Sequence, residues 1–380
     1  MELDDEAEQV TWYRQLIDTS ALDVHALDHG ATRTTAPRFD VLSLLPNLKE
    51  RTKTAIRLHP RRLALDESLP RDVSKIGGDF LWPANEPWPT CEKHEIPWVG
   101  VLQLFQSDFP EFPFKPGTDL CQVLWCPTLE HGFGGAPEAV VRWRDSASIG
   151  PVLERTPRPR FQTHDEAATQ HAMHLYLQAR QMSEYRPPLF PAEPYAAPPR
   201  PKDPGPPKYA ETSCVPLACR VFPERIVEYP RDVLAGELLE EERTILESMS
   251  IPADAPPSEW PHDSPFDYYY SEASVAPGTK LLGYPAWVQA PEYPKCARGH
   301  RMEHIISFDS KEETAGCWQA VEDRELAPRF YENRKDEPSR RAWYALREPT
   351  HLSFGDAGRN YVFLCRECPD WPTVTFLQCS

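Results

Sequence analysis

The residues best suited to chemistry in this sequence are cysteines and histidines near its C-terminal end. Cys365 and Cys368 form a C-x-x-C pair, and Cys296 and His300 form a second pair that lies 65 residues before it. Cysteine sulfur and histidine nitrogen are the ligands of structural zinc sites, which are tetrahedral and four-coordinate. Two ligand pairs on separate β-turns are the arrangement of a zinc ribbon. We therefore predict that Cys296, His300, Cys365 and Cys368 hold one structural Zn²⁺ ion.

Other ligands stay open for this site, because the spacing from Cys296 to His300 is one residue longer than in the usual knuckle. His304, Cys317 and Cys379 are the alternatives to His300. A redox role for the C-x-x-C pair is disfavoured, since such pairs normally open a helix, whereas this one ends a strand and meets a proline. The remaining alternative is a set of reduced, half-buried cysteines with a surface histidine.

A second group of possible ligands occurs earlier in the chain. Cys91, His94, Cys121 and Cys126 could form a similar site. Cys121 and Cys126, however, lie five residues apart within one predicted strand, so their side chains point to opposite faces. We therefore expect one metal site rather than two.

The sequence contains none of the common catalytic motifs: no P-loop, nucleophile elbow, H-E-x-x-H helix or dinucleotide fingerprint. Asp356 lies between two glycines and is followed by Arg359, a pattern that favours a turn leading into a strand. A catalytic cleft that uses Asp356, Arg359 and His351 is the alternative.

An internal repeat organises the chain. The segment from Lys75 to Cys91 matches the segment from Lys280 to Cys296 without a gap. The matched positions are Gly78 with Gly283, Trp82 with Trp287, Trp88 with Tyr293, and Pro89 with Pro294. Agreement in order and spacing over so many positions indicates a duplicated structural unit.

Short apolar runs bounded by proline or glycine predict the strands of this unit. They are residues 98–105, 120–126 and 138–143 in the first copy, and 303–308, 360–365 and 373–378 in the second. A basic strand at a sheet edge is expected near residues 56–63. Helices are expected in the first thirty residues, from Thr163 with its capping partner Glu166, and from about Asp232. Between residues 186 and 207 ten prolines predict an extended connector.

The predicted fold class is α+β and mainly β: an internally duplicated antiparallel β-unit with peripheral helices and a zinc-ribbon-like knuckle in the second copy. Residues 1–60 would form an N-terminal helical or irregular extension, 61–150 the first copy, 151–274 a helical and proline-rich insertion, and 275–380 the second copy. Residues 61–380 are expected to form one composite domain.

Composition limits the classes of function. The net charge of −17 disfavours non-specific binding to nucleic acid phosphates or to anionic lipid. The chain also has no apolar run long enough to span a membrane. We expect no membrane partner and no direct nucleic acid ligand, and the oligomeric state is left open. Ten cysteines without a secretion signal point to a reducing, cytoplasmic location.

With these motifs in view, the chain resembles the YwqG-like family of bacterial proteins, a domain of unknown function. The resemblance rests on the Ser74–Cys91 block, the strand with Gln103, Leu282–Pro285, Gly355–Arg359 with the following Tyr361–Leu364, and Phe376–Cys379. It is similar, more remotely, to the programmed-cell-death-protein-two group, which act as chaperones of a ribosomal protein. The resemblance implies a zinc knuckle and a chaperone-like or immunity-like role. Candidate binding residues are Trp82, Trp88, Gln103, Trp287, Asp356 and Arg359.

We therefore expect a non-enzymatic cytoplasmic protein whose acidic surface binds a basic protein partner. The alternatives are an RNA-processing or hydrolytic enzyme with a site between the two copies, and a structural module that binds its partner through the proline-rich insertion.

Overall fold

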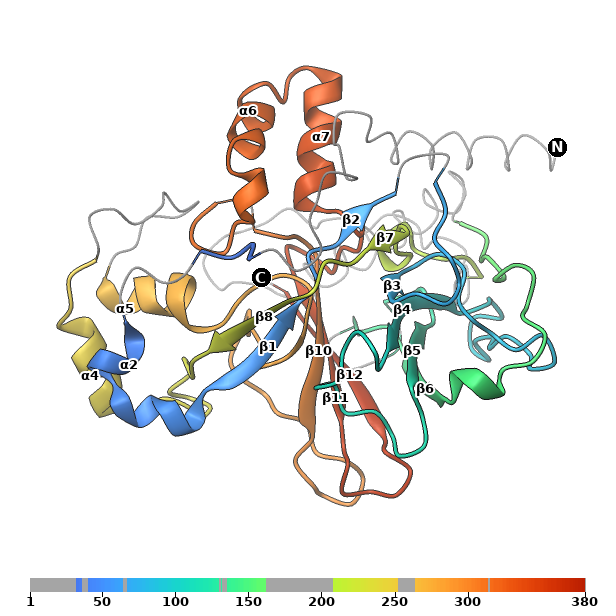
Figure 1. Ribbon diagram of the computed structural model, residues 1–380, viewed down its shortest axis with the longest axis horizontal. Helices are drawn as coiled ribbons and strands as arrows, with labels where there is room; N and C mark the ends of the chain where they lie inside the picture. Colours follow the sequence, from blue (N-terminus) through green and yellow to red (C-terminus); the bar gives the residue numbers. More distant parts are fainter. Residues whose placement is uncertain are drawn as a thin grey trace, which may run out of the picture.

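The computed structural model of the chain describes residues 32–35, 40–63, 67–129, 131, 135–161, 208–251, 264–313 and 315–379. Its strands are β1 Lys53–Arg57, β2 Arg61–Arg62, β3 Lys75–Ile76, β4 Val99–Phe105, β5 Leu120–Trp125, β6 Ala139–Arg144, β7 Cys219–Arg220, β8 Glu224–Glu228, β9 Lys280–Leu282, β10 Glu303–Asp309, β11 Arg359–Leu364 and β12 Thr373–Gln378. Its α-helices are α2 Val41–Leu44, α4 Glu240–Glu247, α5 Pro265–Tyr268, α6 Leu326–Glu332 and α7 Glu337–Arg347. The prediction of a mainly β fold with peripheral helices is confirmed (Figure 1).

The strands form two antiparallel sheets of the same design. One sheet has the order β12-β11-β10-β9-β1-β8, and the other has the order β6-β5-β4-β3-β7-β2. Each row is therefore four strands of one copy followed by one strand of the β1–β2 segment and one strand of the β7–β8 segment. The predicted duplication is visible as this repeated order.

The two copies exchange a strand. The segment β1–β2 precedes the first copy and the segment β7–β8 precedes the second, and each crosses from one sheet to the other. As a result β1 pairs with β9 of the second copy, and β7 pairs with β3 of the first. The sequence repeat extends into these segments, at Ala55 and Ala218, Arg57 and Arg220, Pro60 and Pro223, and Arg62 and Arg225.

The repeated blocks also match in register. Lys75 pairs with Gln103 and Lys280 pairs with Ser307, so the two lysines hold equivalent places. An irregularity follows Gly100 in β4 and His304 in β10, at equivalent points of both strands. These matches place Cys126 and Cys365 at the same position, directly after β5 and β11.

One hydrophobic core lies between the sheets. Ile76, Val101 and Val123 of one sheet join Leu281, Phe308 and Val362 of the other in a single buried cluster. The Trp125 ring meets Phe308 edge-on, with 5.2 Å between ring centroids. The edge strands β6 and β12 also meet, because the Thr375 hydroxyl donates to the Pro137 carbonyl at 2.7 Å. The sheets therefore share their inner faces.

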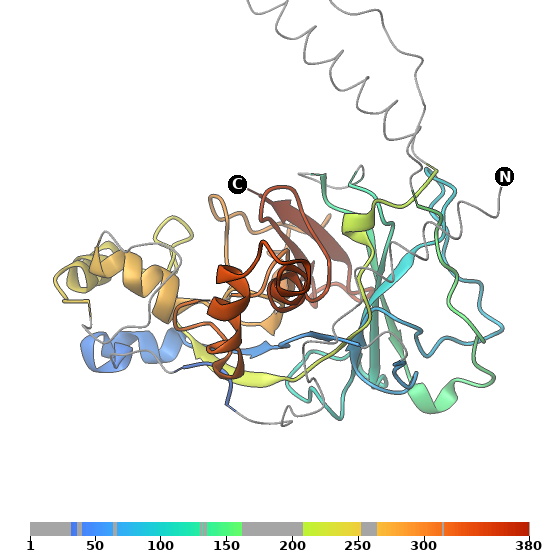
Figure 2. The same ribbon diagram turned by 90° about the horizontal axis from the view of Figure 1, so that it is seen from above.

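The helices lie outside this core (Figures 1 and 2). α2, α4 and α5 cluster at one end around Val41, Leu246 and Tyr269. α6 and α7 form a hairpin that projects from the second copy between β10 and β11, with a small core of its own. No helix among the described residues is long and apolar enough to cross a bilayer.

Several boundaries differ from the predicted ones. The helix expected from Asp232 begins only at Glu240, and it buries Glu242 and Leu246, while Leu234 is 83% exposed. β1 falls in the range assigned to an extension, and β7 and β8 fall in the range assigned to an insertion. The basic segment 56–63 is an edge strand only in part: β2 lies at the edge of its sheet, whereas β1 pairs on both sides. These strands are short and carry charged residues, so their burial depends on partners distant in sequence.

Other predictions fall outside the described residues. They are the helix in the first thirty residues, the helix from Thr163, and the proline-rich connector at 186–207.

Candidate metal centres

The Cys296 group lies on two turns at the tip of the second copy. A bridge between Lys295 and Arg301 closes the first turn, and Gly299 has the positive φ of 86° that the turn requires. The Cys296 amide donates to the His300 carbonyl at 3.0 Å. This local geometry brings the Cys296 sulfur and the His300 ring to the same side of the turn.

The second turn joins β11 to β12. The Cys365 amide donates to the Pro372 carbonyl at 3.0 Å, and the Trp371 amide donates to the Cys368 carbonyl at 3.1 Å. Trp371 has a φ of 54°, in the left-handed region. The tight turn places both C-x-x-C sulfurs beside the Cys296 sulfur.

The four donor atoms are spaced as the corners of a tetrahedron around one ion. His300 Nδ1 lies 3.6 Å from the Cys296 sulfur, 3.7 Å from that of Cys365 and 3.5 Å from that of Cys368. The Cys296 and Cys368 sulfurs are 3.7 Å apart. Zinc–sulfur and zinc–nitrogen bonds of ordinary length require edges of about 3.6 Å for S–N and about 3.8 Å for S–S. The donor set therefore fits a tetrahedral metal ion with no open position.

Burial and electrostatics also suit a thiolate site. The three cysteines are at most 7% exposed. Burial opposes ionisation of Cys296, but the amides of Arg298 and His300 and the Cys368 thiol lower its pKa to about 7. Burial and the neighbouring Cys365 sulfur raise the pKa of Cys368 to about 12. A cation bound among the sulfurs would favour their ionised form, which is the form that coordinates metal.

The alternative ligands lie elsewhere. His304 Nε2 is 2.8 Å from the Ser307 hydroxyl, and the Cys317 sulfur is 3.6 Å from the Tyr268 hydroxyl. Cys379 lies beside Gly355 and Gly358. The structure therefore groups the four predicted residues, with His300 as the fourth.

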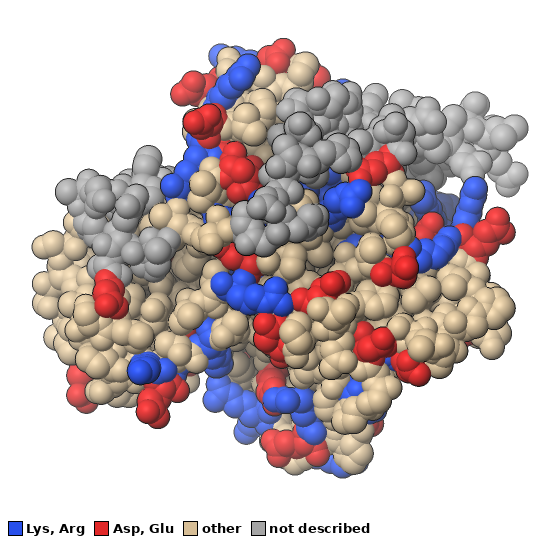
Figure 3. All heavy atoms as spheres, in the orientation of Figure 1, with Lys and Arg blue, Asp and Glu red and all other residues tan. Residues whose placement is uncertain are grey.

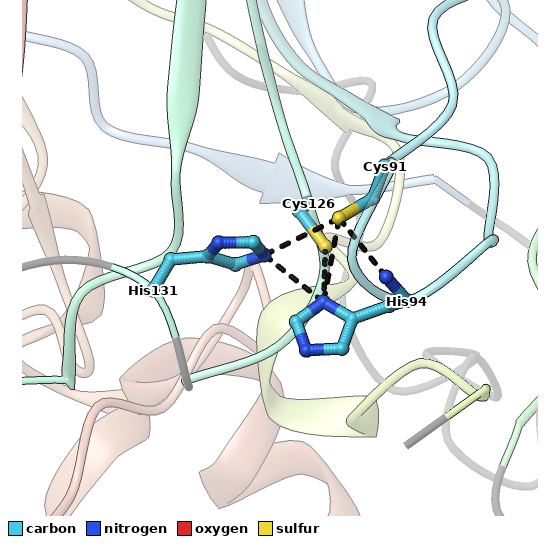
Figure 4. A group of neighbouring side chains, drawn as sticks. All are labelled: Cys91, His94, Cys126 and His131. Carbon is cyan, nitrogen blue, oxygen red and sulfur yellow. Dashed lines mark hydrogen bonds between the residues drawn. The ribbon is translucent and has the colours of Figure 1, made fainter. Parts of the chain in front are cut away.

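The first copy contains a second cluster, formed by Cys91, His94, Cys126 and His131 (Figure 4). Cys121 is not part of it, because its side chain points into the core between the sheets. The opposite-face argument excludes Cys121, and His131 takes its place, so the first copy has a Cys/His group made of three of the four residues that the sequence offered and one that it did not. His131 lies beyond the strand, so strand periodicity could not indicate it. The signal available in the sequence was its place five residues after Cys126, where the second copy has Cys368 three residues after Cys365.

The other predicted site residues lie mainly in the interior. Trp82 and Trp287 are 1% and 3% exposed. The Trp82 ring packs against Trp88, and the Trp287 ring packs against Tyr293, the residue that matches Trp88 in the repeat. Gln103 is fully buried. Its amide donates to the Arg71 and Val73 carbonyls, and its oxygen accepts from the Leu81 amide.

Arg359, which follows the glycine-bounded turn, makes contacts within the fold. Its guanidinium pairs with Asp309 and donates to the Ala286 carbonyl. Asp356 lies in an exposed turn. Burial, together with the positive charge of the nearby Arg62, lowers the pKa of His351 to about 4.

Fold and sites together define a duplicated, strand-exchanged β protein with one Cys/His group per copy. No protein-family model matches the chain, and no curated protein sequence matches it. Membership of the YwqG-like family stays a prediction.

Proposed function

We propose that the protein is a zinc-stabilised, non-enzymatic binding protein that engages a basic protein partner. The observation that carries this proposal is the closed donor set of Cys296, His300, Cys365 and Cys368. Catalytic zinc sites keep a position for water or substrate, whereas structural sites fill all four positions with protein ligands. The metal would join the two turns of the second copy.

Charge supports the nature of the partner. The chain has a net charge of −17, and residues 1–31 contain eight acidic residues and one arginine. On the face shown in Figure 3, Lys and Arg are interspersed with Asp and Glu, without a continuous basic track. A nucleic acid ligand needs such a track to neutralise its phosphates. A basic protein fits the acidic excess better, and it is also the partner that the YwqG-like resemblance implies, in a chaperone-like or immunity-like role.

The test is affinity capture with the full-length chain as bait in lysate of its own host. We expect the captured proteins to be basic, and their recovery to fall as salt rises from about 0.05 M to about 0.5 M, because screening shortens the range of charge attraction. Capture of acidic proteins only, or binding of small molecules alone, would contradict the proposal.

A charge variant sharpens this test. Glu2, Asp4, Asp5, Glu6 and Glu8 changed to their amides should reduce capture several-fold. The comparison variant neutralises three exposed carboxylates of α4, those of Glu240, Glu241 and Glu247. Equal loss per charge removed would indicate a dependence on net charge alone, and no loss in either variant would exclude a charge-driven partner.

A further inference from the structure

We propose that Cys91, His94, Cys126 and His131 form a second zinc site, of the Cys₂His₂ type, in the first copy. The inference rests on the duplication and on the geometry of these side chains, and it does not depend on the proposed partner. The repeat equates Cys91 with Cys296, and strand register equates Cys126 with Cys365. Two of the four donors therefore occupy equivalent positions in both copies.

The hydrogen-bond framework of the two tips is also equivalent. A bridge between Thr90 and Pro97 closes the first turn, as Lys295 and Arg301 do in the second copy. The Cys126 amide donates to the Glu138 carbonyl at 2.9 Å, as Cys365 does to Pro372. The turns therefore present their ligands from the same places, although the histidines stand at different positions within them.

The donor atoms converge on one point (Figure 4). His94 Nδ1 lies 3.4 Å from the sulfurs of both Cys91 and Cys126 and 3.0 Å from His131 Nε2. His131 Nε2 is also 3.4 Å from the Cys91 sulfur. These edges are within a few tenths of an ångström of those around tetrahedral zinc, about 3.6 Å for S–N and about 3.3 Å for N–N. The protons of the two thiols could join these atoms only in pairs, whereas a cation at the centre contacts all four.

The surroundings are those of a metal site. The other ring nitrogen of His131 lies 3.2 Å from a Glu138 carboxylate oxygen. A carboxylate in this place fixes the tautomer and orientation of a zinc-bound histidine. The backbone amide of His94 also donates to the Cys91 sulfur at 3.4 Å, which stabilises a thiolate. In the second copy Glu367 holds the corresponding place near His300, at 3.9 Å.

An ion bound here would stabilise the two turns that residues 208–214 contact on the way to β7. The Glu211 amide donates to the Pro127 carbonyl at 2.8 Å, and its side chain accepts from the Leu129 amide at 2.9 Å. Lys208 pairs with Glu95 of the Cys91 turn at 2.5 Å. Residues 208–214 therefore contact both turns of the cluster, and β7 begins five residues further on, at Cys219.

The test is the metal content of the purified full-length protein, measured by multi-element mass spectrometry. We expect two zinc ions per chain in the natural sequence, one in Cys126→Ala and one in Cys365→Ala. Cys121→Ala is the matched control, because Cys121 is a fully buried cysteine of the same strand outside the cluster, and it should retain two. One zinc in the natural sequence, together with an unchanged count in Cys126→Ala, would overturn the proposal without touching the Cys365 site.

A second variant covers the case in which Cys126→Ala does not fold. His131→Cys keeps four donors and adds a thiolate, so it should still bind two ions. In the cobalt-loaded protein the sulfur-to-metal absorption should rise by about a fifth, from five thiolates to six. No rise would contradict the assignment of His131. Hydrogen exchange at residues 208–214 should also accelerate when zinc is withheld from the natural protein, and unchanged exchange there would contradict the stabilising role.

Discussion

At the scale of single residues, the two copies use the same position for different contacts. Lys280 is fully buried and its ammonium lies 2.5 Å from a carboxylate oxygen of Glu228, which also accepts the amides of Ala276 and Tyr284. Lys75, at the equivalent place, donates to the Pro70 carbonyl at 2.6 Å. A buried charge must find a compensating group, and each copy supplies a different one.

Two histidines make stability depend on pH: His59, which is buried, and His351, which is half-buried. Burial, with the charge of Arg57, lowers the pKa of His59 from 6.5 to about 3, and burial with Arg62 lowers that of His351 to about 4. Both residues are therefore neutral in the folded chain at pH 5, while the unfolded chain binds a proton at each. Their stabilising contribution is complete above pH 6.5 and is lost as the pH falls toward the folded pKa values.

We expect the free energy of unfolding to fall by about 2 kcal/mol per histidine between pH 7 and pH 5. Denaturant unfolding at each pH measures it. His351→Asn should remove about 2 kcal/mol of this loss, whatever its effect at pH 7. Lys335→Gln, at an exposed position, should leave the pH dependence unchanged. An identical pH dependence in His351→Asn would show that His351 is protonated in the folded state.

At the scale of elements, the turns after β3 and β9 depend on backbone that glycine adopts easily. Gly78 has a φ of 73° and Gly283 has a φ of 66°. A β-carbon on Gly78 would meet the Ala218 β-carbon at 3.4 Å, an ordinary contact. A β-carbon on Gly283 would meet that of Ala55 at 2.7 Å and would overlap the Glu228 carboxylate. The equivalent glycines therefore differ in the space around them.

We expect Gly78→Ala to cost about 1–2 kcal/mol, the penalty of a positive φ alone. Gly283→Ala adds steric overlap beside a buried ion pair and should cost at least about 3 kcal/mol. Chemical unfolding of the two variants compares them directly, each serving as the control for the other. Equal costs would mean that the β1–β9 contact relaxes to admit a methyl group.

At the scale of the whole molecule, the strand exchange ties the halves together. β1 directly precedes the first copy in sequence but pairs with β8 and β9 in the sheet of the second, and β7 directly precedes the second copy but pairs with β2 and β3 in the sheet of the first. Neither sheet is complete without a strand from the other copy. The shared core adds to this dependence, because removing one half would expose the apolar inner face of the other.

A chain cut once between residues 162 and 207 should therefore stay assembled. An engineered protease site there allows the cut to be made after folding. The two fragments should co-elute in gel filtration at neutral pH and separate only in denaturant. The uncut variant, treated with inactive protease, is the control. Separation of the fragments under native conditions would show that the exchanged strands contribute little to association.

The sequence by itself determined the mainly β class, the duplication and the grouping of Cys296, Cys365 and Cys368, with His300 favoured as the fourth donor. These follow from local patterns: alternating strands, repeated spacing, and ligand pairs held by tight turns. The tertiary structure alone decided that β1 and β7 change sheets and that His131 joins Cys91, His94 and Cys126. Strand partners, and ligands on neighbouring loops, are determined by packing between segments distant in the chain. The spacing of residues within one segment therefore cannot predict them.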